Sequence, residues 1–323
     1  MLDDRFLAMG TVARVVRDAD SGVDAQAMFA EIERRLTRFD PTSELSLLNA
    51  DPRACVPAAP LLRAAVSAAL RAARLSGGLV DPTVLDALRR CGYTESRAHV
   101  APAALLLQLG SAPPRRPAHP DPAARWRAIE VDHAAGVIRR PPGLELDLGG
   151  SAKGWAADLV AARLGRHGRC AVDCGGDLRV VAGRRARRGP AWDVHVRHPL
   201  TGRPAHTLHV HEGGVATSGI DSRLWVGRHG EPAHHLIDPA TGEPAWTGLL
   251  TVTALAANAL EAEALAKAAL LSGPAAGRPL LEAHDGGVLI HDDGAVEVVD
   301  ARRRPQAVQT VKQSRSSPPR AAR

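Results

Sequence analysis

The chain has 323 residues, of which 45% are hydrophobic, and no long linker divides it, so we expect one large domain with a sizeable buried core. No run approaches the roughly eighteen apolar residues that a membrane helix needs, and Asp3, Asp4 and Arg5 interrupt a signal-peptide start, so we expect a soluble, cytoplasmic protein without a membrane partner. The net charge of +6 does not indicate nucleic-acid binding, because residues 301–323 carry six arginines, one lysine and no acid, and the other 300 residues sum to about −1.

Two helices are expected in the first quarter of the chain. Residues 24–38 repeat apolar side chains at helical spacing, which places Met28, Ile32 and Leu36 on one face. Residues 60–75 are rich in alanine, and the two glycines that follow them are a typical helix stop.

Two further helices are expected after a proline-rich surface loop at residues 112–122. The first, at residues 151–166, directly follows a pair of glycines. The second, at residues 258–272, begins with Asn258 and Glu261 in the spacing of a capping box and continues with an apolar stripe.

Six segments have the composition of β-strands, and several follow one another like hairpins. They lie at Val172 and at residues 178–182, 192–196, 207–210, 249–255 and 288–291. We therefore expect an α+β fold, mainly antiparallel sheet with packed helices. Cys170 and Cys174 share one face of a strand about 13 Å apart, which excludes a paired metal clip, and all four cysteines are expected to be reduced.

Two arginine-rich segments are expected to be solvated. Residues 184–188, bracketed by glycines, are expected at the tip of a hairpin. Residues 301–323 are rich in Pro, Ser, Gln and Arg, which is the composition of a disordered extension. The sequence therefore predicts a folded domain at residues 1–300 with a basic tail, and no specific nucleic-acid partner.

The most informative segment is DLGGSAKGWAAD at residues 147–158, where an apolar run ends in two glycines and a helix starts with Lys153 in its first turns. A phosphate-bearing ligand fits such a turn, because glycines expose backbone N–H groups and the helix N-terminus adds positive potential. Lysine is electrostatically misplaced in a first turn unless an anion faces it. Paired glycines also occur at strand-to-helix turns for steric reasons alone, so this motif by itself leaves both interpretations open.

Further motifs point to one family. VATSG stands at residues 215–219 and HHLIDPATGEP at residues 234–244. With the glycine segment they resemble the FAD:protein FMN transferase (ApbE) family, whose hallmarks are D-L-G-G-x-A-K-G, G-G-D, T-S-G and H-I-x-D-P-x-T-G, in the same order. Other matching segments lie at residues 9–11, 39–49, 78–83, 173–177 and 192–199, so the resemblance covers roughly residues 7–300.

The resemblance implies a single ApbE-like domain that moves FMN from FAD onto a Thr or Ser hydroxyl of an acceptor protein and releases AMP. FAD would be the substrate, Mg²⁺ the metal and the acceptor protein the partner. The positions that match FAD-contacting residues of the family, or are grouped with them, are Met9, Phe39, Asp81, Asp147, Lys153, Thr217, Ser218, Gly219 and Thr251. Met and Phe at such positions are also ordinary core residues.

His235 matches the histidine that the family ties to the chemistry at the flavin-side phosphate. Its near-neutral pKa suits it to take a proton from an attacking hydroxyl or to steady the phosphoryl group. Asp238 is a second catalytic candidate, because it can orient His235. The segment DPATG that it starts also has the pattern of a reverse turn that the Asp caps.

The main departure from the family is at the expected metal site. Relatives usually show A-D-A-x-x-T, in which Asp and Thr bind magnesium, and the carbonyl at the position of Gly150 is a further ligand. This chain has AEALAK at residues 262–267. Glu263 can still offer oxygens to a hard cation, whereas Lys267 cannot ligate while it is charged, and a Glu–Lys pair four residues apart is also a common helix decoration.

Two hypotheses follow from this substitution. The ammonium of Lys267 takes the place of the metal, with Glu263 as its partner, and Lys267 is then a catalytic candidate. Alternatively, the substitution has removed the transferase chemistry and left a non-catalytic FAD-binding protein. Hydrolysis of FAD to FMN and AMP is a third function compatible with the same motifs.

Overall fold

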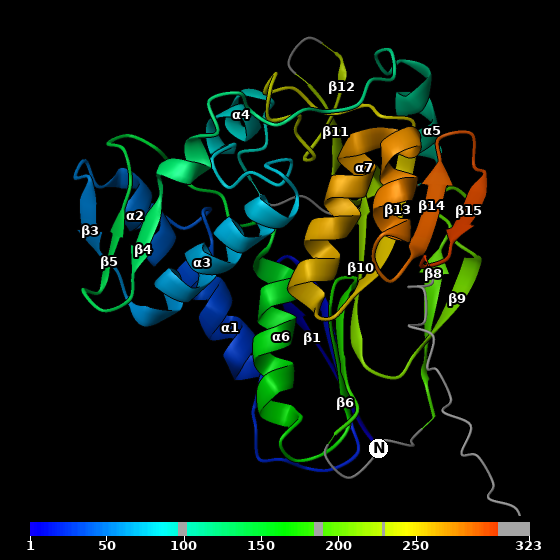
Figure 1. Ribbon diagram of the computed structural model, residues 1–323, viewed down its shortest axis with the longest axis horizontal. Coiled ribbons are helices and arrows are strands. Elements are labelled where there is room, and N and C mark those ends of the chain that lie inside the picture. The colour runs from blue at the N-terminus through cyan, green and yellow to red at the C-terminus, as the bar shows by residue number, and fades with distance from the viewer. Residues whose placement is uncertain (96–101, 184–189, 228–229, 303–323) are drawn as a thin grey trace, which may run out of the picture.

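An eight-stranded sheet, antiparallel throughout, forms the centre of the computed structural model, which describes residues 1–95, 102–183, 190–227 and 230–302 (Figure 1). Its spatial order is β1-β2-β6-β7-β10-β13-β14-β15. The strands are β1 (Leu2–Ala8), β2 (Thr11–Arg17), β6 (Cys170–Cys174), β7 (Asp177–Val181), β10 (Gly213–Gly219), β13 (Leu249–Ala256), β14 (Gly287–His291) and β15 (Val296–Val299).

Two helices cover one face of this sheet. Helix α6 (Ala152–Leu164) packs on β6 and β7, and α7 (Ala259–Glu282) packs on β10 and β13 and along α6 (Figure 1). Asn258 caps α7 by accepting a hydrogen bond from the backbone N–H of Glu261 at 2.9 Å. The helix is interrupted at Gly273, whose φ of 73° is left-handed, and Pro274 follows. The regular part of α7 therefore ends close to the predicted boundary at residue 272.

A hairpin of β8 (Trp192–Arg197) and β9 (Pro204–Val210) covers the opposite face. Val210 packs there with Ala171, Val180 and Val215, which come from three strands of the large sheet. The neighbouring Val172 faces α6 instead, because successive side chains of a strand alternate between faces. The molecule thus has a helical layer, a central sheet and a hairpin layer.

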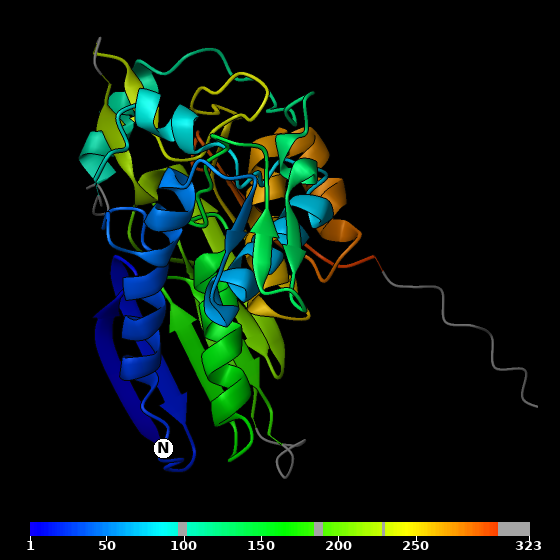
Figure 2. The same ribbon diagram turned by 90° about the vertical axis from the view of Figure 1, so that its left-hand side faces the viewer.

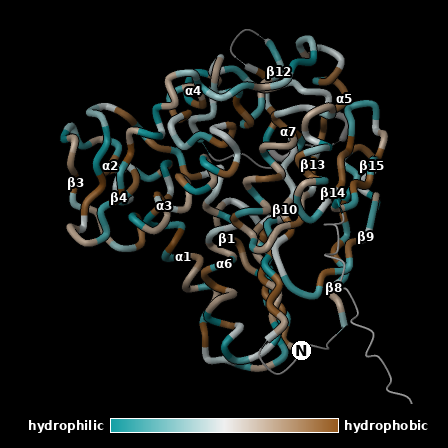
Figure 3. The backbone as a smooth tube through the Cα atoms, viewed as in Figure 1, coloured by the Kyte–Doolittle hydropathy of each residue, from teal (hydrophilic) through white to brown (hydrophobic). Residues whose placement is uncertain are grey.

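The remaining elements lie beside and above this sandwich (Figures 1 and 2). A lateral group contains α1 (Ala25–Leu36), α2 (Glu44–Ala50), α3 (Pro60–Leu75) and the small sheet of β3 (Cys55–Pro57), β5 (Val137–Arg139) and β4 (Glu130–Asp132). The upper group contains α4 (Leu85–Arg90), α5 (Pro102–Gly110), β11 (Leu224–Val226) and β12 (Pro232–His234), with short 3₁₀ turns at Arg125–Ala128 and Ile220–Ser222. Hydrophobic residues concentrate along the strands and the helix faces that contact them (Figure 3). In the described residues no helix is long and apolar enough to cross a bilayer.

The predicted α+β fold, its four helices, its six strands and the loop at residues 112–122 are confirmed. The four helices correspond to α1, α3, α6 and α7, and residues 60–75 match α3 at both ends. Nine strands of the described residues were not predicted, namely β1 to β5, β10 to β12 and β15, and neither were the short helices α2, α4 and α5. The predicted hairpin tip at residues 184–188 and nearly all of the predicted tail fall outside the described residues. No disulfide links the cysteines, all four of which are free thiols.

Candidate active site

Several strand ends meet at one end of the central sheet. Ala8 pairs with Thr11 across the β1–β2 turn, and Cys174 pairs with Asp177 across the β6–β7 turn. The last residue of β10, Gly219, lies opposite Thr251 of β13. Because the sheet is antiparallel, these turns and ends face the same side. The N-terminus of α6 and a cavity of about 360 Å³ lie beside them.

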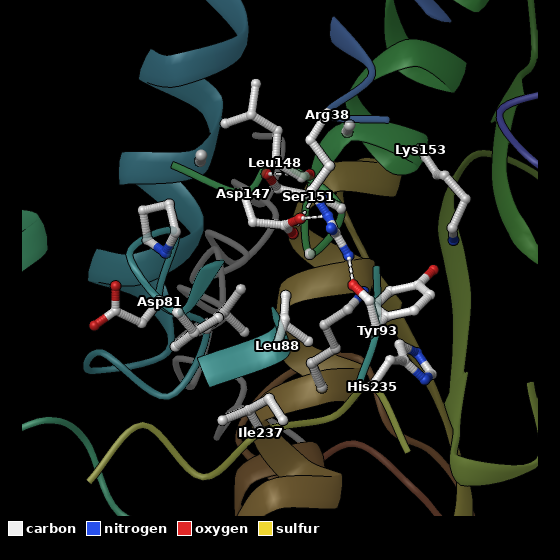
Figure 4. A pocket seen from close by; sticks show the side chains of 18 of the residues that line it. Arg38, Asp81, Leu88, Tyr93, Asp147, Leu148, Ser151, Lys153, His235 and Ile237 are labelled. Atoms are coloured by element: carbon white, nitrogen blue, oxygen red, sulfur yellow. Dashed lines mark hydrogen bonds and ion pairs between the residues drawn. The ribbon is translucent and has the colours of Figure 1, made fainter. Parts of the chain in front are cut away.

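Arg38, at the end of α1, joins the glycine segment to an aromatic group in this cavity (Figure 4). Its Nε lies 2.7 Å from Asp147 Oδ2, and its Nη2 donates to the carbonyl oxygen of Tyr93 at 2.8 Å. The guanidinium carbon is 4.3 Å from the Phe39 ring centroid and 4.7 Å from that of Tyr93. Tyr93 in turn stacks on Trp225 with centroids 5.4 Å apart. This wall offers flat apolar surface and a fixed positive charge to a ligand.

Asp147 is oriented from two sides. Besides its ion pair with Arg38, its Oδ1 accepts a hydrogen bond from the backbone N–H of Gly149 at 2.9 Å. The carboxylate therefore holds the first glycine of the turn in place. Asp147 thus fixes the shape of the turn as well as lining the cavity.

Asp81 lies at the opposite side of the cavity from Lys153 and His235 (Figure 4). One of its carboxylate oxygens accepts two hydrogen bonds from Thr83, each 2.7 Å long. The other oxygen, Oδ2, is buried and has no hydrogen-bond partner among the described residues. Burial raises the pKa of Asp81, and the Thr83 donors oppose this shift. A buried acceptor without a partner suits a donor on a ligand.

His235 follows β12 and lines the cavity edge-on to Tyr93, with ring centroids 6.5 Å apart. Burial lowers the pKa of His235 well below its usual value, and the positive charges of Arg223 and Lys267 act in the same direction. Its Nδ1 is buried without a hydrogen-bond partner in the described structure. At neutral pH the ring is therefore uncharged and can accept a proton.

A second, smaller cavity of about 40 Å³ adjoins the first. Thr217, Ser218 and Gly219 at the end of β10 line this smaller cavity and not the large one. The hydroxyl of Thr217 is bonded to that of Thr253 at 2.9 Å, whereas the buried Ser218 Oγ has no partner among the described residues. Lys153, His235, Lys267 and Arg223 line both cavities, so the basic groups gather where the two meet.

Four ionisable side chains beside this junction form what we call the charge quartet: Lys153, Asp177, Glu263 and Lys267. Lys153 Nζ is ion-paired with Asp177 Oδ2 and lies 3.7 Å from Glu263 Oε1. Lys267 Nζ lies 2.7 Å from the same Glu263 oxygen, and Glu263 Oε2 accepts a hydrogen bond from the backbone N–H of Gly154 at 2.9 Å. Both carboxylates are fully buried.

The quartet shifts the protonation of its members. Burial lowers the pKa of Lys153, but the charges of Asp177 and Glu263 outweigh this effect and raise it. Burial raises the pKa of Glu263, and the two lysines outweigh that effect and lower it. Burial and the charge of Glu263 together raise the pKa of Asp177. Glu263 is thus the carboxylate that stays ionised most firmly.

These residues do not fit a divalent cation. A magnesium ion requires a nearly octahedral shell of oxygen ligands. The set that the resemblance implies offers one carboxylate, Glu263, and one carbonyl, that of Gly150, and its third position is Lys267. One oxygen of Glu263 already binds the ammonium of Lys267 and the other binds the Gly154 amide. Gly150 lines the large cavity and could offer its carbonyl to a metal ion. The group beside Glu263, however, is the ammonium of Lys267, which is itself a cation.

The structure brings most of the predicted site residues together. Those that line one or both cavities are Met9, Phe39, Asp81, Asp147, Gly150, Lys153, Thr217, Ser218, Gly219, His235 and Lys267. Three predicted residues line neither. Glu263 lies behind the lysines, and Thr251 lies behind Gly219, where an added Cβ would come within 2.7 Å of Thr251 Cγ2.

Asp238 is the third residue away from the cavities. Its Oδ1 accepts hydrogen bonds from the backbone N–H groups of His119 at 2.9 Å and Ala240 at 3.1 Å. Its carbonyl accepts one from the backbone N–H of Thr241 at 3.3 Å, which closes the predicted reverse turn, and another from Gly242 at 2.8 Å. The turn is confirmed with Asp238 as its cap, and the role of Asp238 in orienting His235 stays a prediction.

Among the lining residues that were not predicted, Arg38, Tyr93 and Arg223 contribute charged or aromatic groups to the cavity. Arg38 directly precedes the Phe39 segment, and Tyr93 is the chain's single tyrosine. These two features are the signals that point to them. Arg223 has no comparable signal, because it reaches the site through the short element after β10.

Comparison with known proteins agrees with this geometry. The sequence model of the ApbE family matches residues 9–290. A Salmonella typhimurium protein named FAD:protein FMN transferase is 30% identical over 272 residues, which are 79% of this chain and 74% of that protein. A Vibrio cholerae protein of the same name is 29% identical over 237 residues, 69% of this chain and 70% of the relative.

A Treponema pallidum protein of that name is 36% identical over 186 residues, and this match spans about half of each chain, 49% here and 50% there. Among solved structures, the ApbE protein of Thermotoga maritima superposes with a TM-score of 0.72 at 24% identity, covering 92% of this chain and 96% of that one. The flavin transferase ApbE of Vibrio cholerae gives 0.68 at 21% identity, with 92% and 96% covered. These two likenesses show the same fold, and with the family match over residues 9–290 they establish that the chain belongs to the ApbE family.

Proposed function

We propose that this protein is an FAD:protein FMN transferase, which moves FMN from FAD onto a Thr or Ser hydroxyl of an acceptor protein and releases AMP. The observation that carries the proposal is the junction of the two cavities, where an uncharged histidine and two lysine ammonium groups line the same space. Phosphoryl transfer needs this combination of a proton acceptor and positive charge. The names of the ApbE relatives support the same activity.

FAD is proposed to occupy the large cavity. Phe39 and Tyr93 with Arg38 offer a flat, partly cationic surface to an aromatic ring, and Asp81 offers an acceptor at the other side. The diphosphate of FAD is then proposed to lie near the junction of the two cavities, which the basic side chains line. Helix α6 begins there, so its N-terminal N–H groups add positive potential.

The reaction exchanges one phosphate–oxygen bond for another. The acceptor hydroxyl oxygen bonds to the flavin-side phosphorus, and the bond from that phosphorus to the bridging oxygen breaks. The bridging oxygen leaves with AMP. His235 takes the hydroxyl proton, and Lys153 and Lys267 balance charge on the phosphate oxygens. No metal enters this scheme, because the residues at the expected Mg²⁺ position do not fit one.

Two other functions use the same cavity. A non-catalytic FAD-binding protein would return FAD intact, and an FAD pyrophosphatase would release AMP together with free FMN. The proton acceptor at His235 favours catalysis over binding alone, and the names of the relatives favour transfer over hydrolysis. A cytoplasmic location stays a prediction.

The test is incubation of the full chain with FAD and a threonine-bearing acceptor domain, following AMP release and flavin that stays on the acceptor after denaturation. The transferase produces both in equal amounts. Intact FAD with no AMP under any buffer condition overturns the proposal in favour of a binding protein, and AMP with only free FMN overturns it in favour of a hydrolase.

His235→Gln provides the residue-level test. We expect transfer to fall by about 10²- to 10⁴-fold, the usual contribution of a positioned proton acceptor, while FAD affinity changes little. His209→Asn is the matched control, because His209 is exposed on β9 in the hairpin layer. Because its lowered pKa keeps His235 neutral in mild acid, kcat/KM should hold below pH 6.5 and fall only at more acidic pH. Loss centred at pH 6.5 contradicts this assignment.

A further inference from the structure

The pairing of Lys267 with Glu263 goes beyond a surface helix decoration. Lys267 Nζ lies 2.7 Å from Glu263 Oε1, four residues earlier on α7, and Glu263 is fully buried. Lys267 is 9% exposed and lines both cavities. On the same helix, Arg278 and Glu282 have the same spacing with Nε 2.9 Å from Oε1, but the Arg278 side chain is 53% exposed. Of these two pairs, the one with Lys267 faces the site.

The oxygens of Glu263 are committed to other partners. Oε1 faces the ammonium groups of Lys267 at 2.7 Å and Lys153 at 3.7 Å, and Oε2 accepts the Gly154 amide. The other buried carboxylate, Asp177, is ion-paired with Lys153. Glu263 thus faces both lysines, whereas Asp177 is ion-paired with Lys153.

A divalent cation bound to Glu263 would have to displace Lys267 or sit beside it. Displacement leaves a buried ammonium without its partner, and coexistence places three cationic centres around one carboxylate. The other carboxylate of the quartet, Asp177, is engaged with Lys153 through Oδ2, and its Oδ1 is buried without a hydrogen-bond partner in the described structure. The position is therefore selective against a divalent cation.

The ammonium of Lys267 can nevertheless act on a ligand. It has three N–H donors, of which Glu263 takes one. The remaining donors are available to phosphate oxygens at the cavity junction, where Arg223 and Lys153 also lie. Unlike a metal ion, the ammonium of Lys267 does not have to exchange bound water before the phosphate binds.

We infer that Lys267 supplies the positive charge for which an ApbE transferase would otherwise need a divalent cation, so that this protein binds FAD and transfers FMN without a metal. The inference rests on the proposed function, since it concerns the charge that faces the FAD diphosphate. The inference differs from the hypothesis of a non-catalytic FAD-binding protein, because it gives Lys267 a role in binding the FAD diphosphate.

The first experiment measures FAD affinity by flavin fluorescence with the metal-depleted full chain, in EDTA and in excess Mg²⁺, and Mn²⁺ binding by electron paramagnetic resonance. We expect the dissociation constant for FAD to agree within twofold in the two buffers, and no stoichiometric Mn²⁺ site. FAD binding that tightens tenfold or more with Mg²⁺, or one tightly bound Mn²⁺ per chain, overturns the inference and leaves the transferase proposal standing.

AMP release in the same samples separates the two proposals. Equal release of AMP with transfer to the acceptor in EDTA and in Mg²⁺ supports both. Metal-independent FAD binding without AMP in either buffer overturns the transferase and, with it, the role of Lys267 in transfer. Failure to bind FAD in both buffers overturns both proposals.

The variant pair K267T and E263D/K267T converts the site toward a carboxylate and a hydroxyl four residues apart. We expect FAD binding in EDTA to weaken at least tenfold, and in the double variant to recover with Mg²⁺, together with a new Mn²⁺ signal. Arg278→Thr is the matched control, because it breaks the exposed pair on the same helix and should leave FAD affinity unchanged. Full FAD affinity of K267T in EDTA shows that the ammonium is dispensable and overturns the inference.

Discussion

The backbone nitrogen of Gly154 donates a hydrogen bond to Glu263 Oε2 at 2.9 Å, which joins the start of α6 to α7 inside the molecule. A Cβ at Gly154 would lie 2.6 Å from the carbonyl oxygen of Ala259 and 3.0 Å from that carboxylate oxygen. The glycine therefore permits a helix contact that a larger residue would obstruct. Through this contact the glycine segment and the charge quartet are parts of one arrangement.

Gly154→Ala should force the two helices apart. We expect a loss of about 1–3 kcal/mol in the free energy of unfolding, the usual cost of overpacking, because backbone atoms of α7 cannot yield as a side chain can. Urea unfolding followed by circular dichroism measures this. Gly110→Ala is the control, since an added Cβ at the end of α5 meets nothing within 4 Å and should be neutral or slightly stabilising. Equal stability of both variants contradicts the proposed contact.

Arg38→Met should destabilise the protein by roughly 2–4 kcal/mol, because it leaves the Asp147 carboxylate without its buried partner. The side chains of Arg38 and Asp147 are only 7% and 12% exposed. Arg34→Met, four residues earlier, breaks a pair with Glu31 whose side chains are 67% and 49% exposed. That control should cost less than about 1 kcal/mol. The difference in urea midpoints tests the prediction, which fails if the two variants lose the same amount.

Adjacent hydroxyls at the end of β10 should behave in opposite ways. Ser218→Ala removes a buried oxygen without a described partner, so stability should stay within about 0.5 kcal/mol, while FAD affinity should fall because Ser218 lines the smaller cavity. Thr217→Val breaks the bond to Thr253 and should cost about 1 kcal/mol of stability. Thermal unfolding and flavin fluorescence on both variants separate these effects. A Ser218→Ala protein that unfolds more readily than Thr217→Val contradicts the assignment.

His234 should make the fold sensitive to mild acid. Burial lowers the pKa of His234 to about 3, and its Nδ1 accepts a hydrogen bond from the Leu236 backbone at 3.2 Å. The unfolded chain, with a normal histidine pKa near 6.5, takes up a proton more readily than the folded one. This contribution to stability is therefore complete above about pH 6.5 and is lost as the pH falls toward 3, at up to about 1.4 kcal/mol per pH unit.

His234→Asn keeps an acceptor for Leu236 and removes the titrating ring. Its stability should fall less steeply between pH 6.5 and 5 than that of the parent chain, in urea titrations at each pH. Parallel curves for the two proteins would show that His234 does not carry the acid sensitivity. His133→Asn is a control for loss of an exposed histidine, which is bonded to Ser67 on the surface.

Local pattern explains which elements could be predicted. Helices α1 and α3 have a strong apolar period, and Asn258 caps α7 as its spacing indicates. Strand β10 was missed because its sequence, GGVATSG, is glycine-rich and buried on both faces, so it lacks alternation. Strand β1 is largely exposed at the edge of the sheet, and its polar start carries no strand signal.

The amino-acid sequence by itself determined the periodic elements, the glycine turn before α6 and the motifs that indicate the family, because each depends on residues close together in the chain. Only the tertiary structure decided that Glu263 reaches Gly154 and Lys153 across more than a hundred residues, and that Arg38 meets Asp147. Such contacts depend on how α6, α7 and the sheet pack. Burial and neighbouring charges, which set the protonation of His235 and Asp177, exist only after that packing.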